Sequence, residues 1–241
     1  MTDAPVKPLP VDPEILLRIR VMEPRDVPEV AALHRADMGS SLWAQLGEPF
    51  LVEVYRGLVS HPDFRGFVYE EGGCLGGFIA GTTHGPRMFG HLYRRLAFRL
   101  GRTLVPALLA KPSLARPLLE TFLYSRRSRP HGAAQTVAES LFCSFKPELR
   151  GKRISGLINK VLFDQLAAEG HEAVLITTDA DNPLSARQLT SWGFEQTGRF
   201  RFYGKEMIAW RLDLMSSPRV EAVNRWSAPG QKPGQTAPGH S

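Results

Sequence analysis

Hydrophobic and polar residues change their spacing several times along the chain, and each spacing predicts an element. Apolar and polar residues alternate over Leu17–Val21, which is typical of a strand. Ile154–Ala168 carries apolar residues at helical spacing and is followed by Gly170, which predicts a helix and its end. The apolar runs on either side of Glu71-Gly72-Gly73 predict a β-hairpin. The other expected elements are helices after Asp26 and over Phe50–Leu58, strands over Val137–Phe145 and Ala173–Thr177, a helix over Asn182–Trp192, and strands over Gly198–Tyr203 and Met207–Leu214.

The order of these elements, βααβββαβαββ, predicts an α/β or α+β fold with a mixed sheet. We expect one domain over residues 16–215. Residues 1–15 and 216–241 are expected to be disordered tails, because the second is rich in Ser, Pro, Gly and Gln and neither shows an apolar period.

Composition narrows the class of protein. The chain has 241 residues, of which 43% are hydrophobic and 22% charged, the balance of an ordinary globular domain. Two cysteines, Cys74 and Cys143, exclude a disulfide scaffold and favour a reducing compartment. No apolar run approaches the ~20 residues of a membrane span, and the first residues lack the apolar segment of a secretion signal. The expected location is the cytoplasm.

Positive charge is concentrated in one segment. The net charge is +6, but His84–His131 alone contributes +9, with ten Lys and Arg against the single acid Glu120. Apolar residues from Phe89 to Leu100 recur at helical spacing opposite arginines, which predicts a basic amphipathic helix inside an insertion over residues 84–134. Four roles stay open for it: a helical lid, a homodimer surface, a dock for an acidic carrier protein or phosphorylated substrate, and an anionic membrane surface. Nucleic acid is disfavoured, because few aromatic residues stand beside the arginines.

The segment Pro147–Leu157 is the richest in candidate chemistry. A strand ends at Pro147, a turn follows that holds Gly151 and three cations, and a helix begins. The first amides of a helix have no partner inside it, and the helix dipole makes its N-terminus positive, so such a junction suits a phosphate or pyrophosphate. The alternative is a plain helix start with solvated surface cations. The three cations are Arg150, Lys152 and Arg153.

This segment resembles motif A of the GNAT superfamily of N-acetyltransferases. Asn182–Phe194 is similar to the family's later Asn…Gly-Phe segment, and Glu71–Ile79 to its second hairpin. The resemblance covers about residues 18–214 and implies a mixed, mostly antiparallel sheet of six to seven strands flanked by helices, with the helical insertion between the third and fourth strands. The sequence departs from the family at three positions. Arg153 replaces the first loop glycine, Ser155 stands where the family has Gly or Ala, and Leu189 replaces the tyrosine that often protonates the leaving thiolate.

The resemblance further implies a V-shaped split between the strand that ends at Phe145 and the strand Ala173–Thr177. Acetyl-CoA, or another acyl-CoA, would bind there as co-substrate, with its pantetheine arm paired to the first strand like an added strand. Its pyrophosphate would meet the amides of the loop, and Asn182 would help to hold the arm. The expected cofactor-binding residues are Cys143, Ser144, Phe145, Arg150, Gly151, Lys152, Arg153, Ile154, Ser155, Gly156 and Asn182.

Acyl transfer to an amine requires a neutral nucleophile. An amine with a pKa of ~10.4 is only ~0.04% neutral at pH 7, which is equivalent to ~4.6 kcal/mol. Glu139 is the candidate base, because it resembles the glutamate of the histone-acetyltransferase branch; the alternative is a solvated strand carboxylate. A backbone amide near Leu141–Cys143 is expected to polarise the thioester carbonyl. Tyr203 could supply a proton, and Cys143 itself is expected to be a small buried residue.

The remaining residues favour no other chemistry. The histidines lack metal-ligand spacing, so no metal is expected, and no phosphate-binding Gly-x-x-x-x-Gly-Lys motif occurs. The prediction is therefore an N-acyltransferase that acts on a small-molecule amine or amino sugar first, and on a protein amine second. The alternative is a non-catalytic module that binds acyl-CoA or a membrane surface through the basic insertion.

Overall fold

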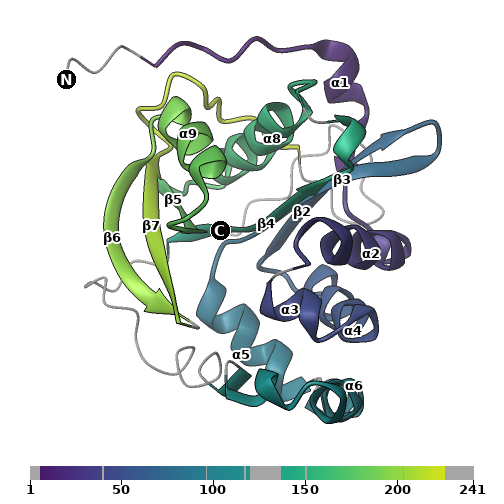
Figure 1. Ribbon diagram of the computed structural model, residues 1–241. Helices are drawn as coiled ribbons and strands as arrows, with labels where there is room; N and C mark the ends of the chain where they lie inside the picture. Colours follow the sequence, from purple (N-terminus) through teal and green to yellow (C-terminus); the bar gives the residue numbers. More distant parts are fainter. Residues whose placement is uncertain are drawn as a thin grey trace, which may run out of the picture.

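The computed structural model describes residues 6–39, 41–95, 97–116, 118–119, 137–149, 151–202 and 204–225. It contains one seven-stranded sheet in the order β1-β2-β3-β4-β5-β7-β6 (Figure 1). Neighbouring strands are antiparallel except β4 and β5, which are parallel. The strands are β1 (Ile19–Val21), β2 (Phe64–Glu71), β3 (Cys74–Thr82), β4 (Ala138–Phe145), β5 (Ala173–Asp179), β6 (Glu195–Phe202) and β7 (Lys205–Asp213). The predicted mixed, mostly antiparallel sheet is confirmed.

Helices cover both faces of the sheet, with α8 and α9 on one face and α2 to α6 on the other (Figure 1). Apart from α1, α3 and the helices of the insertion, the order of elements is the predicted βααβββαβαββ. The helices are α1 (Pro13–Leu17), α2 (Val27–Asp37), α3 (Leu42–Gln45), α4 (Glu48–Val59), α5 (Gly85–Arg95), α6 (Ala97–Ala110), α8 (Ile154–Ala168) and α9 (Pro183–Trp192), with 3-10 turns at Pro24–Asp26, Pro112–Leu114 and Pro147–Leu149.

Two hydrophobic cores lie back to back across the sheet. Phe78 of β3 packs with α2 and α4 in one core, and the next residue, Ile79, packs with α8 in the other. Successive side chains of a strand point to opposite faces, so a strand covered on both sides reads as a continuous apolar run. This explains the run Leu75–Ala80 in the sequence, and it fixes the middle of the sheet as the rigid frame of the molecule.

The predicted hairpin is confirmed between β2 and β3. Glu71 pairs with Cys74, so the loop has two residues, Gly72 and Gly73. Their φ angles are 60° and 78°, a region that glycine enters without steric cost and that a type I′ turn requires at both positions.

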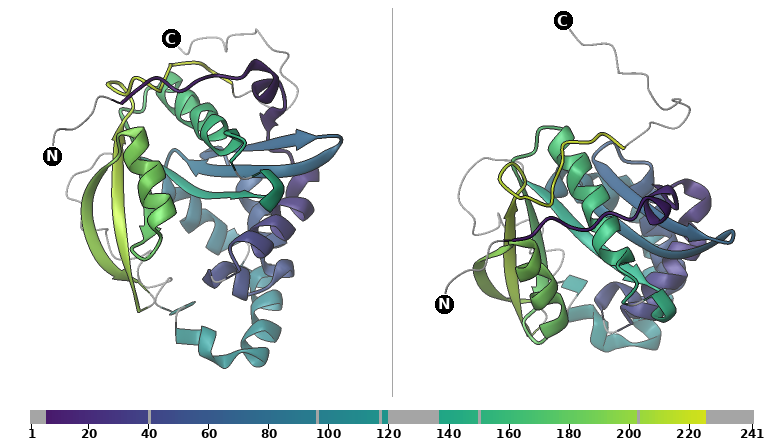
Figure 2. Two further views of the ribbon diagram at one scale, coloured as in Figure 1. Left: turned by 45° about the horizontal axis from the view of Figure 1, so that its top comes forward. Right: turned by 90° about the horizontal axis from the view of Figure 1, so that it is seen from above.

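Both expected tails are partly packed against α8. Asp12 caps α1, and Leu9 lies beside the first turn of α8, while the purple N-terminal segment crosses that helix in Figure 2. The segment 216–225 covers the outer side of α8, where the Lys160 Nζ donates to the carbonyl of Arg219 at 3.0 Å and Asp164 accepts from the amide of Glu221 at 2.8 Å. Buried polar groups need partners, and Lys160 and Asp164 find them in this segment. The structure therefore differs from the expected tails over residues 6–15 and 216–225; residues 1–5 and 226–241 lie outside the described part.

The insertion between β3 and β4 is helical where it is described. Leu92 of α5 and Leu100 of α6 are buried in the same core as α4, so the insertion packs on the domain rather than hanging free. The buried carboxylate of Asp63, directly before β2, pairs with Arg87 and ties the first turn of α5 to the sheet. Of the helices in the described residues, none is long and apolar enough to span a bilayer.

Candidate functional site

β4 and β5 separate after a short parallel contact. Only Ala138–Ser140 pairs with Val174–Ile176. Beyond this contact β4 continues to Phe145 with pairing to β3 alone, and β5 continues to Asp179 with pairing to β7 alone. The facing edges of the two strands therefore diverge toward their carboxyl ends, which is the split that the family resemblance implies.

A β-bulge marks the start of the split. Ala80 of β3 pairs with Phe142, but the next residue, Gly81, pairs with Ser140, so Leu141 is an extra residue in β4. A bulge bends its strand and leaves the extra residue outside the ladder. Because Ser140 is also the last β4 residue paired with β5, the ladder is disrupted on both sides of β4 at the same point. This is where the sequence predicts an amide that polarises the thioester.

The backbone of β4 beyond the bulge presents an open edge to the split. The amide of Lys146 donates to the carbonyl of Gly76 in β3 at 2.8 Å. Amides alternate in direction along a strand, so those of Cys143 and Phe145 point away from β3, into the split. The amide of Phe145 indeed donates to Oδ2 of Asp37 in α2, at 3.4 Å. The backbone of Ser144 is directed at β3, so this predicted cofactor-binding residue does not line the open edge.

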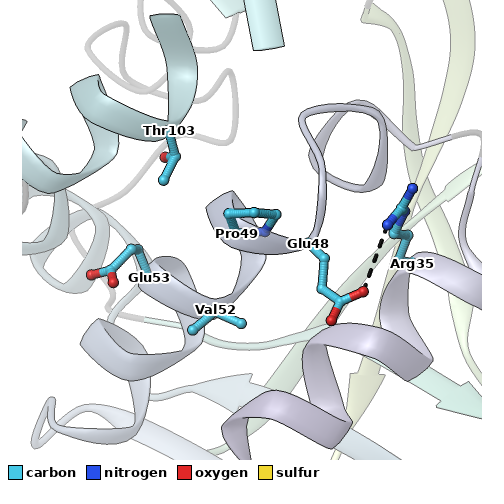
Figure 3. A pocket seen from close by; sticks show the side chains of 6 residues that line it. All are labelled: Arg35, Glu48, Pro49, Val52, Glu53 and Thr103. Carbon is cyan, nitrogen blue, oxygen red and sulfur yellow. Dashed lines mark ion pairs between the residues drawn. The ribbon is translucent and has the colours of Figure 1, made fainter. Parts of the chain in front are cut away.

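A cavity of about 110 Å³ lies at this end of β4, lined by Leu33, Ala36, Asp37, Phe145 and Pro147. It joins the open edge to the last turn of α2 and to the loop that follows β4. A larger open depression of about 490 Å³ lies between α2, α4 and α6, where Arg35 and Glu48 form an ion pair at 3.6 Å (Figure 3). No strand contributes to its lining, which places it outside the split.

The loop after β4 takes left-handed conformations at two residues. Gly151 has a φ of 79° and Arg153, which precedes the first residue of α8, has a φ of 62°. Arg153 is the one non-glycine residue with positive φ in the described part of the chain. The position at which the resemblance expects a glycine thus has a conformation that glycine enters freely, and a residue with a Cβ holds it at a cost of about 1–2 kcal/mol.

The N-terminus of α8 is left without a side-chain cap. Arg153 occupies the cap position, and its side chain makes no capping hydrogen bond. Among the described residues, no side chain caps the first amides of the helix, at Ile154, Ser155 and Gly156, which are donors of the kind that suit an anion. Gly151 and the side chains of Lys152 and Arg153 are exposed beside them, and Arg150 lies outside the described residues.

No protein-family model matches the sequence, and no curated protein matches it. Solved structures share its architecture at low identity. The ribosomal-protein-S18-alanine N-acetyltransferase from Escherichia coli is 12% identical, with a TM-score of 0.52 over 81% of this chain and 92% of that one. The polyamine N-acetyltransferase from Drosophila melanogaster is 13% identical, with a TM-score of 0.52 over 81% and 98%. A protein from Desulfovibrio desulfuricans assigned to the GNAT family of acetyltransferases is 12% identical, with a TM-score of 0.50 over 81% and 98%.

The chain has the GNAT fold. The similarity covers nearly the full length of these proteins, so the insertion is an addition to a complete fold and not a replacement for part of it.

Two positions that the family resemblance singles out have structural roles in this GNAT fold. Asn182 caps α9, with its Oδ1 accepting from the amide of Ser185 at 3.1 Å. Leu189 is 7% exposed and packs in the core beneath α9. The predicted cofactor contact of Asn182 therefore competes with a capping bond, and Leu189 supplies no proton donor. Tyr203 lies outside the described residues.

Glu139 lies on the opposite side of the sheet from α8 and is 8% exposed. A Cβ built on Gly85, the first residue of α5, would be 2.6 Å from its Oε1, so the carboxylate rests against the start of the insertion. The alternative of a solvated strand carboxylate is wrong. Arg87, within the same turn of α5, forms a hydrogen bond that lowers the pKa of Asp63, and this ion pair holds the helix start in place.

Aromatic side chains that the sequence analysis missed surround Phe142, next to the bulge. The rings of His34 and Trp43 lie 4.9 and 5.0 Å from that of Phe142. His34 is fully buried, its Nδ1 lies 2.7 Å from the Tyr55 hydroxyl, and burial lowers its pKa to about 4, so it is neutral at pH 7. These contacts join α2, α3 and α4 to β4. The spacing of hydrophobic residues within each element does not predict them.

Cys143 is a partly buried residue that packs against the core on the α8 side of the sheet. Burial raises its pKa to about 12, although Nδ2 of Asn159, 3.8 Å from its sulfur, acts in the opposite direction. The thiolate is the reactive form of cysteine, so this residue is a poor nucleophile at neutral pH. Within the described ranges, no three His, Cys, Asp or Glu side chains gather as they would around a metal ion.

The strain at Arg153 can be measured. Replacement of Arg153 by glycine is expected to raise the free energy of unfolding by about 1 kcal/mol, because glycine has no Cβ to clash at positive φ. Urea unfolding of Arg153→Gly and Arg153→Ala gives the comparison, since alanine removes the guanidinium but keeps the strain. Equal stability of the two variants would contradict the left-handed conformation.

The two cysteines should differ in reactivity. Iodoacetamide at pH 8 is expected to alkylate the exposed Cys74 and to leave Cys143 unmodified, because a thiol with a pKa of about 12 is only ~0.01% ionised there. Mass spectrometry of tryptic peptides reports each site, and the denatured protein, in which both thiols should react, is the control. Labelling of Cys143 at the rate of Cys74 in the folded protein would show that the thiol is not buried.

Proposed function

We propose that the protein is an N-acyltransferase that moves an acetyl or other acyl group from coenzyme A to a primary amine. The observation that carries this proposal is the split between β4 and β5, with open strand amides along it and the uncapped N-terminus of α8 at its mouth. A thioester of coenzyme A needs those two groups of donors, one for its pantetheine arm and one for its diphosphate.

The residues present fit an acyl-CoA. Cys143 and Phe145 would pair with the amide groups of the pantetheine arm, as an added strand does. The amides of Ile154–Gly156, with Lys152 and Arg153, would hold the diphosphate. Asp37 accepts from the amide of Phe145 at 3.4 Å, so this carboxylate has to give up that bond when the arm binds.

The bound acyl-CoA supplies an activated acyl group as a thioester. Glu139 takes a proton from the acceptor ammonium, directly or through a water molecule, and the neutral nitrogen attacks the carbonyl carbon. A C–N bond forms, the nitrogen gives its second proton to water, the C–S bond breaks, and coenzyme A leaves as a thiolate. Its parent thiol has a pKa of ~8.5, so departure needs no strong acid, which is consistent with a buried leucine at position 189.

The acceptor is a primary amine. We favour a small-molecule amine or amino sugar, and a protein amine second. Proteins with this fold differ in the acceptor that their names give: one of the similar structures is named for a ribosomal-protein alanine and another for a polyamine. The partly buried Trp43 and Phe142 lie on the same side of the sheet as Glu139, where an apolar part of the acceptor could pack.

A second candidate is a module that binds acyl-CoA without turning it over. Two observations favour it: Arg153 in place of a loop glycine, and the burial of Leu189 where the family often has its proton donor.

Titration with acetyl-CoA tests both candidates. Calorimetry should show binding, and the charge reversal Lys152→Glu should weaken it about tenfold through lost attraction and added repulsion, a change of ~1.4 kcal/mol. Arg25→Glu, at an exposed arginine outside the split, is the matched control. Absence of heat and of a melting shift at millimolar acetyl-CoA would exclude both readings.

Turnover separates the enzyme from the module. We expect release of free thiol from acetyl-CoA with at least one member of a panel of small amines and amino-terminal peptides. Binding of acetyl-CoA without thiol release across the panel would support the non-catalytic module.

The role of Glu139 is tested by Glu139→Gln. The rate at neutral pH is expected to fall about 100-fold, with acetyl-CoA affinity unchanged, because the amide cannot accept the ammonium proton. The variant should also gain activity with rising pH, as more of the free amine becomes neutral. Glu195→Gln, on the exposed face of β6, is the matched control; an unchanged rate and pH profile for Glu139→Gln would reject the role.

A further inference from the structure

The outer face of α6 carries apolar side chains that no described residue covers. Val105 and Leu109, four positions apart and so on one face of the helix, are 58% and 78% exposed. The inner face is apolar as well, because Leu100, Leu104 and Leu108 pack in the core against α4. α6 is therefore apolar on two sides. The inner side packs in the core, and the outer side has no packing partner among the described residues.

Cations surround this outer face. Arg102, one turn before Val105, and Lys111, directly after the helix, are both exposed. Arg99, 61% exposed, reaches toward Glu53 of α4 at 3.8 Å and so lies on the flank of the helix. The sequence contains no Asp or Glu from His84 to Leu119. The surface that an incoming partner meets is thus both apolar and positively charged.

The position of α6 lets an extended surface reach it. α5 leads away from the sheet, and α6 lies at the end of the molecule opposite α8 (Figures 1 and 2). The hollow beside it, between α4 and α6, lies on the flank with Glu48 and Glu53 (Figure 3), so these two acidic side chains lie off the outer face.

We infer that the outer face of α6 docks on an anionic lipid bilayer. Val105 and Leu109 enter the boundary between headgroups and acyl chains, and Arg102 and Lys111 contact the headgroup phosphates, the arrangement of helices that lie in a membrane interface. A purely acidic protein would satisfy the cations but leave the two aliphatic side chains in water. A second copy of this chain would bring two positively charged faces together, so charge complementarity favours the lipid.

The test uses the full chain and sedimentation with vesicles. Wild-type protein should bind phosphatidylcholine vesicles that contain phosphatidylglycerol, bind pure phosphatidylcholine vesicles at least tenfold more weakly, and lose affinity as salt rises. Leu109→Gln, which removes an inserted side chain, and Lys111→Glu, which removes an attraction and adds a repulsion, should each weaken binding about tenfold.

Leu184→Gln is the matched control, because Leu184 on α9 is 74% exposed but lies on the other face of the sheet. Melting temperatures equal to wild type confirm that the variants are folded. Three outcomes would overturn the inference: no binding to anionic vesicles, equal losses in Leu109→Gln and Leu184→Gln, or a dimer in vesicle-free sedimentation that Leu109→Gln abolishes. The last outcome would assign the face to a second copy of the chain.

Discussion

The short contact between β4 and β5 is the constraint on which the candidate site depends. Three residue pairs join the two parallel strands, and the sheet is otherwise continuous through antiparallel ladders on either side. If β4 and β5 paired along their full length, the amides of Cys143 and Phe145 would be satisfied by a neighbouring strand and nothing could bind there. Because the strands diverge instead, one edge of each is left open while the rest of the fold stays rigid.

The same region concentrates several departures from a fully satisfied backbone. The bulge at Leu141 removes a residue from the ladder, α8 begins without a side-chain cap, and Arg153 holds a left-handed conformation. Each costs free energy, and proteins tend to accept such costs where a ligand compensates for them. The hydrogen bond from Phe145 to Asp37 is a partial compensation, since it gives one amide of the open edge an acceptor from α2.

The sequence predicted the elements and their order because each is encoded locally. Periodic apolar residues specify α8, two consecutive glycines specify the turn between β2 and β3, and the loop before α8 is recognisable from Gly151 and its cations. The contacts that complete the site come from residues far apart in the chain. Asp37 and Phe145 are 108 positions apart in the sequence, and Gly85 and Glu139 are separated by the whole insertion. A hydrophobic periodicity describes one element at a time, so it predicts neither of these contacts.

The tails show a different limit of sequence reasoning. Composition predicted disorder after residue 215, because the segment is rich in Ser, Pro, Gly and Gln and shows no apolar period. Residues 216–225 are held instead by polar contacts with α8: their backbone supplies partners to Lys160, Asp164 and Gln165, and Glu221 and Arg225 lie near the charges of Lys160 and Asp164. A search for a hydrophobic pattern does not reveal such an interaction, because most of the contacts of this segment are polar and involve peptide groups and the charged side chains of Arg219, Glu221 and Arg225.

The insertion links the candidate site to the outer surface of the molecule. Its first residue, Gly85, lies against Glu139, its first turn is fixed by the ion pair of Arg87 with Asp63, and its second helix carries the exposed face of α6. All three features are on the side of the sheet that holds α2 to α6, opposite α8 and the uncapped amides. A partner bound to α6 would therefore approach the side of the sheet on which Glu139, the proposed base, lies and would leave the α8 side uncovered. If the proposed function holds, the insertion would stand on the acceptor side of the sheet, and the split and the start of α8 would serve the acyl-CoA from the other side.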